Sequence, residues 1–164
     1  MKNPAEILKE EHHAVLGKLA TLEGLVNDLE QPEKVSAKLK ELAAFFDTEF
    51  WVHFDKEERA LFPEFDGFMP RGAGPLAAMI DEHGVIRNTN EVLQESVSSY
   101  LNGDLSAETK KTLKQSGMHF IQYLRAHISK EDGLFPRLAE MHLGPMQFER
   151  VVNRFSEIEK ASNK

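Results

Sequence analysis

Four long segments of the chain each carry an apolar stripe, and histidine interrupts every stripe. Apolar residues recur along these segments at alternating steps of four and three, which is the period of one face of an α-helix. Strand-like alternation is nearly absent. Breaks at Pro32, in the run 66–75, at Gly103 and at 144–145 separate the segments. The pattern therefore predicts an all-helical protein.

The breaks also give the expected order of the helices. We expect helices near residues 4–30, 33–65, 75–101, 106–142 and 145–160. Pro4 and Pro75 suit first-turn positions, and Ser106 suits the start of the fourth helix. Because short connections make successive helices antiparallel, the fold class predicted is all-α, an up-down-up-down four-helix bundle over about 4–142. A short C-terminal fifth helix completes a single domain of residues 1–164.

The polar interruptions of the stripes are expected to meet at one height of the bundle. The interruptions on which the prediction rests are His12, His53, Glu57, His83, His127 and Glu131. Each glutamate follows a histidine by four residues, so the two side chains share one helix face. His12 and His53 both lie about 20 residues from the first turn, and His83 and His127 lie about 20 to 25 from the turn near residue 103. At about 1.5 Å per residue, these levels agree within one or two helical turns.

Such a layer is best explained by metal ions. A single histidine on an apolar face is usually a hydrogen-bonded core residue, but that explanation would have to hold four times at one height. Two buried carboxylates without a counter-charge would cost several kcal/mol each. Neutral imidazoles cannot supply that charge, whereas two divalent cations can. The chain has no cysteine, and a set of His, Asp and Glu ligands suits iron, manganese or zinc.

The composition narrows the remaining classes of function. A net charge of −7 argues against a nucleic-acid partner, because phosphate contacts need a basic surface. No apolar run approaches the length that a membrane-spanning helix requires, so we expect no membrane association. The first residues carry charge at once and do not resemble an export signal, which favours a cytoplasmic location.

Two alternatives to the six ligands stay open at this stage. His13 is the natural substitute if His12 does not face the core. Asp132, one residue past Glu131, is a rival for the carboxylate of the fourth helix.

Two further residues lie one turn before a proposed ligand on the predicted stripes. Glu49 precedes His53 and is a candidate hydrogen-bond partner, ligand or proton donor. Tyr123 precedes His127 and either donates a proton at the centre or packs in the core. His119 is expected at a helix interface or in solvent.

The motifs resemble those of the haemerythrin-like (HHE cation-binding) family over residues from about 5 to 142. The segments that carry the likeness are LKEEH (8–12), HFDKEERALFP (53–63), GPLAAMIDEH (74–83) and HISKEDGLFP (127–136). The resemblance implies two non-haem iron ions bridged by carboxylates. The implied ligands are His12, His53, Glu57, His83, His127 and Glu131, with Glu57 and Glu131 as the bridges.

Two departures from the oxygen-carrying members bear on function. These carriers have a second histidine four residues after the first on the third helix, where this chain has Arg87. They also use HxxxxD on the fourth helix, where Glu131 and Asp132 both stand. One fewer histidine implies an open coordination position. The favoured function is therefore binding or sensing of dioxygen or nitric oxide; the alternatives are a redox enzyme consuming peroxide or nitric oxide, an iron storage or donation protein, and a purely structural bundle.

Overall fold

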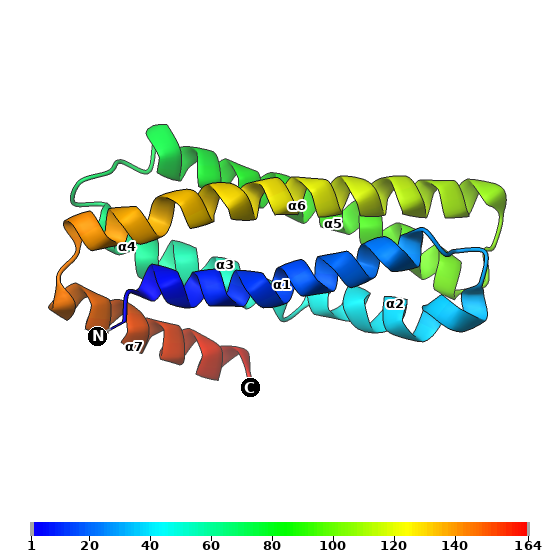
Figure 1. The fold of residues 1–164 in the computed structure, drawn as a ribbon, viewed down its shortest axis with the longest axis horizontal. Helices are drawn as coiled ribbons and strands as arrows, with labels where there is room; N and C mark the ends of the chain where they lie inside the picture. The colour runs from blue at the N-terminus through cyan, green and yellow to red at the C-terminus, as the bar shows by residue number, and fades with distance from the viewer. Residues whose placement is uncertain (1, 164) are drawn as a thin grey trace.

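The computed structural model describes residues 2–163, and all regular structure in that range is helical, as predicted (Figure 1). The elements are α1 (Pro4–Val26), α2 (Pro32–Asp47), α3 (Phe50–Lys56), the π-helical turn η1 (Glu57–Leu61), α4 (Phe62–Phe65), α5 (Gly74–Leu101), α6 (Ala107–His142) and α7 (Pro145–Ser162). No helix in the described range has the length and apolar character needed to cross a bilayer.

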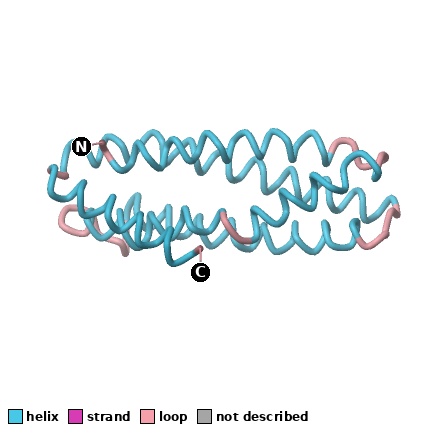
Figure 2. The backbone as a smooth tube through the Cα atoms, turned by 90° about the horizontal axis from the view of Figure 1, so that it is seen from below, coloured by secondary structure: helices cyan, strands magenta, loops and turns pink. Residues whose placement is uncertain are grey.

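The long helices lie side by side, with their axes roughly aligned along the long direction of the molecule. In Figure 1, α1 runs from the end that holds the N-terminus to the far end, and the chain returns through α2, α3, η1 and α4. The same path is repeated by α5 and α6. The loops gather mainly at the two ends, with one break part-way along, as Figure 2 shows. Helix α6 packs against both α1 and α5, and α7 packs on α3, η1 and α1.

Helix starts follow the local sequence signals. The side chain of Asn3 accepts a hydrogen bond from the backbone N–H of Ala5, and Pro4 begins the helix without an N–H to satisfy. The hydroxyl of Ser106 accepts from the N–H of Thr109, so the predicted start of α6 is confirmed. Pro75 stands in the first turn of α5, also as predicted.

The first helix ends earlier than the predicted residue 30. It stops at Val26, where both the backbone N–H and the side-chain amide of Asn27 donate to the carbonyl of Glu23. The connection is then held against the bundle because the hydroxyl of Tyr100 donates to the carbonyl of Leu29 over 2.8 Å.

The prediction of one continuous helix over residues 33–65 was wrong. The hydroxyl of Thr48 donates to the carbonyl of Ala44, and the N–H of Thr48 bonds to Phe45 instead, which breaks the α-helical ladder. The backbone of Thr48 leaves the helical region, at φ −131° and ψ −81°, and the helix resumes at Phe50. Phe50 is buried, whereas Glu49 is exposed and does not continue the stripe.

The π-helical turn accounts for a difference in length between the two Glu…Leu-Phe-Pro motifs. Three residues separate Glu57 from Leu61, whereas two separate Glu131 from Leu134. A π turn takes up one extra residue within a helix, and the N–H of Phe62 accordingly bonds to the carbonyl of Glu57. The phenylalanines of the two motifs, Phe62 and Phe135, are therefore both buried in the same cluster despite the extra residue.

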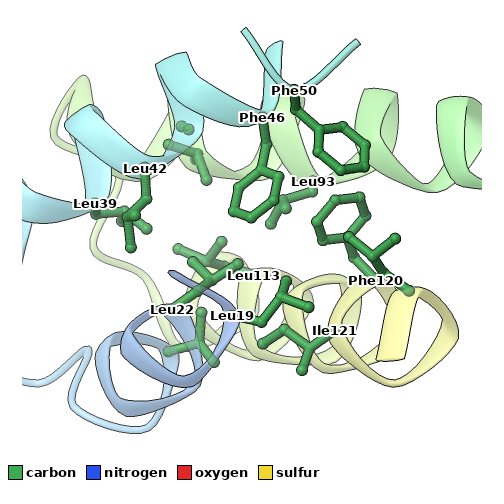
Figure 3. Packing of buried hydrophobic residues seen from close by; sticks show 14 of the residues in the cluster. Leu19, Leu22, Leu39, Leu42, Phe46, Phe50, Leu93, Leu113, Phe120 and Ile121 are labelled. Carbon is green, nitrogen blue, oxygen red and sulfur yellow. The ribbon is translucent and has the colours of Figure 1, made fainter. Parts of the chain in front are cut away.

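The buried apolar side chains form two clusters. The larger fills the half of the bundle that includes α2 and contains Leu19, Leu39, Phe46 and Phe120 (Figure 3). The smaller joins the first turn of α1, η1, α4, the ends of α5 and α6, and α7. Histidines 12, 53, 83 and 127 belong to neither cluster, although all are buried, and they occupy the layer between the two.

Close helix approach gives a prediction about two glycines. A Cβ atom at Gly117 of α6 would lie 3.0 Å from Cγ1 of Val26, whereas a Cβ at Gly17 of α1 would meet nothing within 4 Å. Gly17→Ala is expected to stabilise the fold by about 0.5–1 kcal/mol through helix propensity. Gly117→Ala should lose that gain to strain, so thermal unfolding should rank the two variants in this order. Equal stabilisation by both would contradict the close approach.

Candidate metal centre

Four histidines from four helical elements converge in the layer between the two apolar clusters. His12 lies on α1, His53 on α3, His83 on α5 and His127 on α6, and none is more than 5% exposed. Nε2 of His12 lies 2.8 Å from Nε2 of His53. Two ring nitrogens at this distance repel each other unless a proton or another cation lies between them.

Two fully buried glutamates complete the layer. Glu57 begins η1, and its carboxylate oxygens lie 3.2 Å from Nε2 of His53 and 3.0 Å from Nε2 of His83. Glu131 on α6 lies 3.2 Å from Nε2 of His12, 3.4 Å from that of His83 and 3.0 Å from that of His127. Both carboxylates therefore stand between histidines of different helices.

The six side chains form two groups that share both glutamates. In each group the possible ligand atoms all lie within 4.8 Å of one another. The groups are His12, His53, Glu57 and Glu131, and Glu57, His83, His127 and Glu131. A carboxylate that belongs to two adjacent groups is placed to bridge two ions. All six residues predicted from the stripes are thus brought together.

Several buried polar atoms in this layer have no hydrogen-bond partner. They include both carboxylate oxygens of Glu57, Oε1 of Glu131 and Nε2 of His127. A buried polar atom without a partner costs free energy, so clusters of such atoms need an explanation. Imidazole nitrogens and carboxylate oxygens are ligands for iron and other divalent metals. The donor set therefore fits metal ions.

The pKa values point to a centre that needs positive charge. Burial alone would lower the pKa of His53, but the charge of Glu57 and hydrogen bonds to carboxylates outweigh it and raise the pKa to about 10. The effect of burial is likewise outweighed at His83, where the neighbouring carboxylates of Glu131 and Glu57 raise the pKa to about 11. The carboxylates of this layer therefore favour positive charge beside them, which protons on imidazole or metal ions can supply.

Each histidine also has a carboxylate against its outward nitrogen, Nδ1. Hydrogen-bonding distances are 2.6 Å from His12 to Asp132, 3.0 Å from His53 to Glu11 and 3.0 Å from His127 to Glu82. Glu58 lies 3.5 Å from Nδ1 of His83, which has no hydrogen-bond partner. A carboxylate at Nδ1 favours the tautomer with its proton there, which leaves the Nε2 lone pair facing inward. This is the usual outer partner of a metal-bound histidine.

The chain matches a family model described as the Hemerythrin HHE cation binding domain over residues 3–138. It belongs to this family. No curated protein and no solved structure matched the chain. Membership implies metal-ion binding, with iron as the metal suggested, and the two buried His/Glu groups are the place in the molecule suited to it.

The haemerythrin-like centre leaves out the two alternative ligands. His13 is exposed on α1, because it lies one residue round the helix from the buried His12. Asp132 is in neither group, and its carboxylate lies against the outward nitrogen of His12.

The two residues considered as proton donors also lie outside the groups. Glu49 is exposed, and Phe50 takes the buried position beside it. Tyr123 is partly buried and packs against the larger apolar cluster, as one of its two interpretations predicted. His119 is exposed, and His142 stacks on Phe68.

Arg87, which stands where an oxygen carrier would have a further histidine, does not enter the centre. Its side chain is 45% exposed, and Nη2 lies 3.9 Å from a carboxylate oxygen of Glu58. The guanidinium also lies over the ring of Trp51, at 5.2 Å from the centroid. Arg87 therefore faces the outer carboxylate of His83 rather than a metal position.

The outer carboxylates Glu11, Glu58 and Glu82 were missed by the sequence reasoning. Each is a direct neighbour in sequence of a proposed ligand, and a neighbour lies about 100° round an α-helix, on the flank that meets the next helix. The contacts accordingly run round the bundle: from α1 to α3, from η1 to α5, from α5 to α6 and from α6 back to α1. The available signal was an acidic residue directly beside four of the six proposed ligands, namely His12, Glu57, His83 and Glu131.

Proposed function

We propose that this chain is an up-down-up-down four-helix bundle with α7 as a fifth helix, forming one domain around two iron ions. One ion would be held by His12 and His53 and the other by His83 and His127. Glu57 and Glu131 would bridge them. The observation that carries the proposal is that two four-residue groups share both glutamates while all four Nε2 atoms face inward.

The site would bind a small diatomic ligand, dioxygen or nitric oxide. Each group offers four side chains, which leaves coordination positions for a ligand from outside, as in other non-haem iron sites. Iron supplies reversible ligand binding and one-electron chemistry when it is bound. Phe54 stacks on the ring of His83 with the ring centroids 3.7 Å apart, and the nearly parallel ring of Phe62 lies 6.4 Å from it, so apolar rings limit the access of water.

Two alternative functions receive less support. Turnover of peroxide or nitric oxide needs a proton donor at the centre, and within residues 2–163 no hydrogen bond joins Glu49 or Tyr123 to any of the six side chains. Iron donation requires the ion to leave, and all six side chains are at most 5% exposed. Burial of this extent favours a retained cofactor.

The proposal is tested by iron content and absorption spectra. Purified protein loaded with ferrous iron should hold two ions per chain and show the spectrum of a carboxylate-bridged ferric pair after oxidation. After anaerobic reduction, addition of dioxygen or nitric oxide should change the spectrum, and removal of the gas should reverse the change. Iron below one ion per chain after loading would contradict the centre, and irreversible oxidation without a reversible change would contradict ligand binding.

Two neighbouring histidines provide a matched pair of variants. His12→Ala removes a side chain of one metal position and is expected to lower bound iron from two ions to one or fewer, since the outer partner Asp132 cannot replace the imidazole without moving. His13→Ala, at an exposed position one residue away, should keep both ions. The number of iron ions bound per chain shows which histidine is the ligand. Loss of iron in His13→Ala but not in His12→Ala would identify His13 as the ligand.

A further inference from the structure

Lys56 is a buried lysine in direct contact with the outer carboxylate of His53. Only 4% of the residue is exposed. Its ammonium group lies 2.7 Å from Oε2 of Glu11, and the other oxygen of Glu11 lies 3.0 Å from Nδ1 of His53. A second carboxylate, that of Glu159, also pairs with the ammonium. A continuous chain of charged contacts therefore runs from α7 to the metal position of His12 and His53.

Lys56 differs from the cations beside the other outer carboxylates. Lys130 lies 3.0 Å from Glu82, but its side chain is 57% exposed, and the side chain of Arg87 is 45% exposed. Water and salt screen such exposed pairs, whose contribution is small. The side chain of Lys56 is 5% exposed, so its charge is screened far less. Only the ammonium of these pairs is buried, since the side chains of Glu11 and Glu159 are 31% and 53% exposed, and a buried ammonium without partners is unfavourable.

The second partner of Lys56 belongs to a helix outside the family match. Glu159 lies on α7, which begins at Pro145, whereas the family model ends at residue 138. Helix α7 is held on the bundle by buried Val151 and Phe155 and by Arg150, whose guanidinium lies 2.8 Å from Glu64. Phe155 also lies beside Lys56, whose ammonium is 5.7 Å from the ring centroid, whereas the Arg150–Glu64 pair does not involve Lys56.

We propose that Lys56 is a positioning residue for the metal position of His12 and His53, and that Glu159 of α7 secures Lys56 there. Lys56 holds the carboxylate of Glu11 against Nδ1 of His53. Glu11 in turn keeps the proton on Nδ1 and the Nε2 lone pair directed inward. The C-terminal helix thereby becomes part of the support of the centre. This inference rests on the proposed function, because it needs a metal ion at this position.

A cavity beside His53 explains what would happen without the lysine. The cavity has a volume of about 240 Å³, and Glu11, His53 and Lys56 line it together with Lys18 and Glu49. With Lys56 removed, the carboxylate of Glu11 has room to turn into this space towards water. The imidazole of His53 would then lose the partner that fixes its orientation, while the positions of His83 and His127 keep theirs.

The test is the rate at which the iron-loaded protein loses each ion to excess chelator. Lys56→Met is expected to speed the release of one of the two ions about 10-fold or more, in line with the effect of removing outer partners of metal ligands, and to leave the other unchanged. Lys56→Arg should restore most of the wild-type rate. Arg150→Gln, which removes an α7 ion pair that does not touch Lys56, should stay within about twofold of wild type in the same assay.

A second variant shows whether Glu159 acts through Lys56. Glu159→Gln alone should speed release of the same ion, and it should add nothing in the Lys56→Met background. The reduction potential of the iron should also fall in Lys56→Met, because loss of a nearby positive charge favours the ferric state. Since the side chain of Glu159 is 53% exposed, this variant is expected to fold even if Lys56→Met does not.

The possible outcomes distinguish a failure of the positioning role of Lys56 from a failure of the proposed iron-binding function. If wild-type protein takes up two ions but Lys56→Met and Glu159→Gln release both at the wild-type rate, the positioning role is overturned and the proposed function stands. Equal acceleration of both ions, or full additivity of the two substitutions, would also overturn it. If wild-type protein binds no iron, the proposed function and the inference fall together.

Discussion

Glu131→Gln is expected to empty both metal positions. The carboxylate of Glu131 lies within 3.4 Å of Nε2 of His12, His83 and His127, so it contacts histidines of both groups. Glutamine has nearly the same shape but carries no charge and offers only one good oxygen ligand. We expect the affinity for iron to fall by at least about 100-fold, the upper range found when even an outer partner of a ligand is removed. Iron per chain after dialysis measures the loss.

Asp132→Asn is the matched control for this prediction. Its carboxylate contacts only the outward nitrogen of His12, so its removal should weaken one metal position by about 10- to 100-fold and leave the second unchanged. At saturating iron the variant should still load two ions. The opposite result, an empty centre in Asp132→Asn and a full one in Glu131→Gln, would show that Asp132 and not Glu131 is the ligand.

Removal of iron is expected to cause a large loss of thermal stability. Without a metal ion, the oxygens of Glu57 and Oε1 of Glu131 remain buried without hydrogen-bond partners, and Nε2 of His12 faces that of His53 at 2.8 Å. Ions that bind only the folded chain stabilise it by about 4 kcal/mol when free metal is 1,000 times the dissociation constant. For a chain of this length, such a gain corresponds to roughly 8–16 °C in Tm.

Circular dichroism at 222 nm, recorded during heating of chelator-treated and iron-reconstituted protein, measures this difference. Glu131→Gln serves as the control, because its Tm should not respond to added iron. His13→Ala should respond as wild type does. An equal Tm with and without iron in the wild-type protein would instead favour the structural bundle, in which the six side chains satisfy one another through protons.

The sequence by itself determined the helical architecture and the set of residues that meet at the centre. The period of the apolar stripes defines one buried face on each long helix, and equal distances from the turns bring interruptions of those faces to one height. His12, His53, His83 and His127 were found in this way, together with the two glutamates that follow at a spacing of four. Such predictions succeed because periodicity and helix rise are local properties of the chain.

Local rules failed where two competing preferences lay within one helix. The stripe over 33–65 predicted an uninterrupted helix with Glu49 inside, but the hydroxyl of Thr48 bonds to a backbone carbonyl, the helix is interrupted there, and Glu49 is exposed. The extra residue after Glu57 was likewise visible in the sequence, but its accommodation by a π turn depends on the packing of Phe62 against the rest of the core. The spacing of apolar residues says nothing about the energy of the Thr48 hydrogen bond or of the packing of Phe62.

Only the tertiary structure decided the outer layer of the centre. Glu11, Glu58, Glu82 and Asp132 each act on a histidine of a neighbouring helix, so their roles depend on the rotation of two helices relative to each other. The same holds for Lys56, which pairs with Glu159 at a separation of 103 residues. The spacing within one helix fixes which face is buried, whereas contacts between helices follow from how those faces pack together.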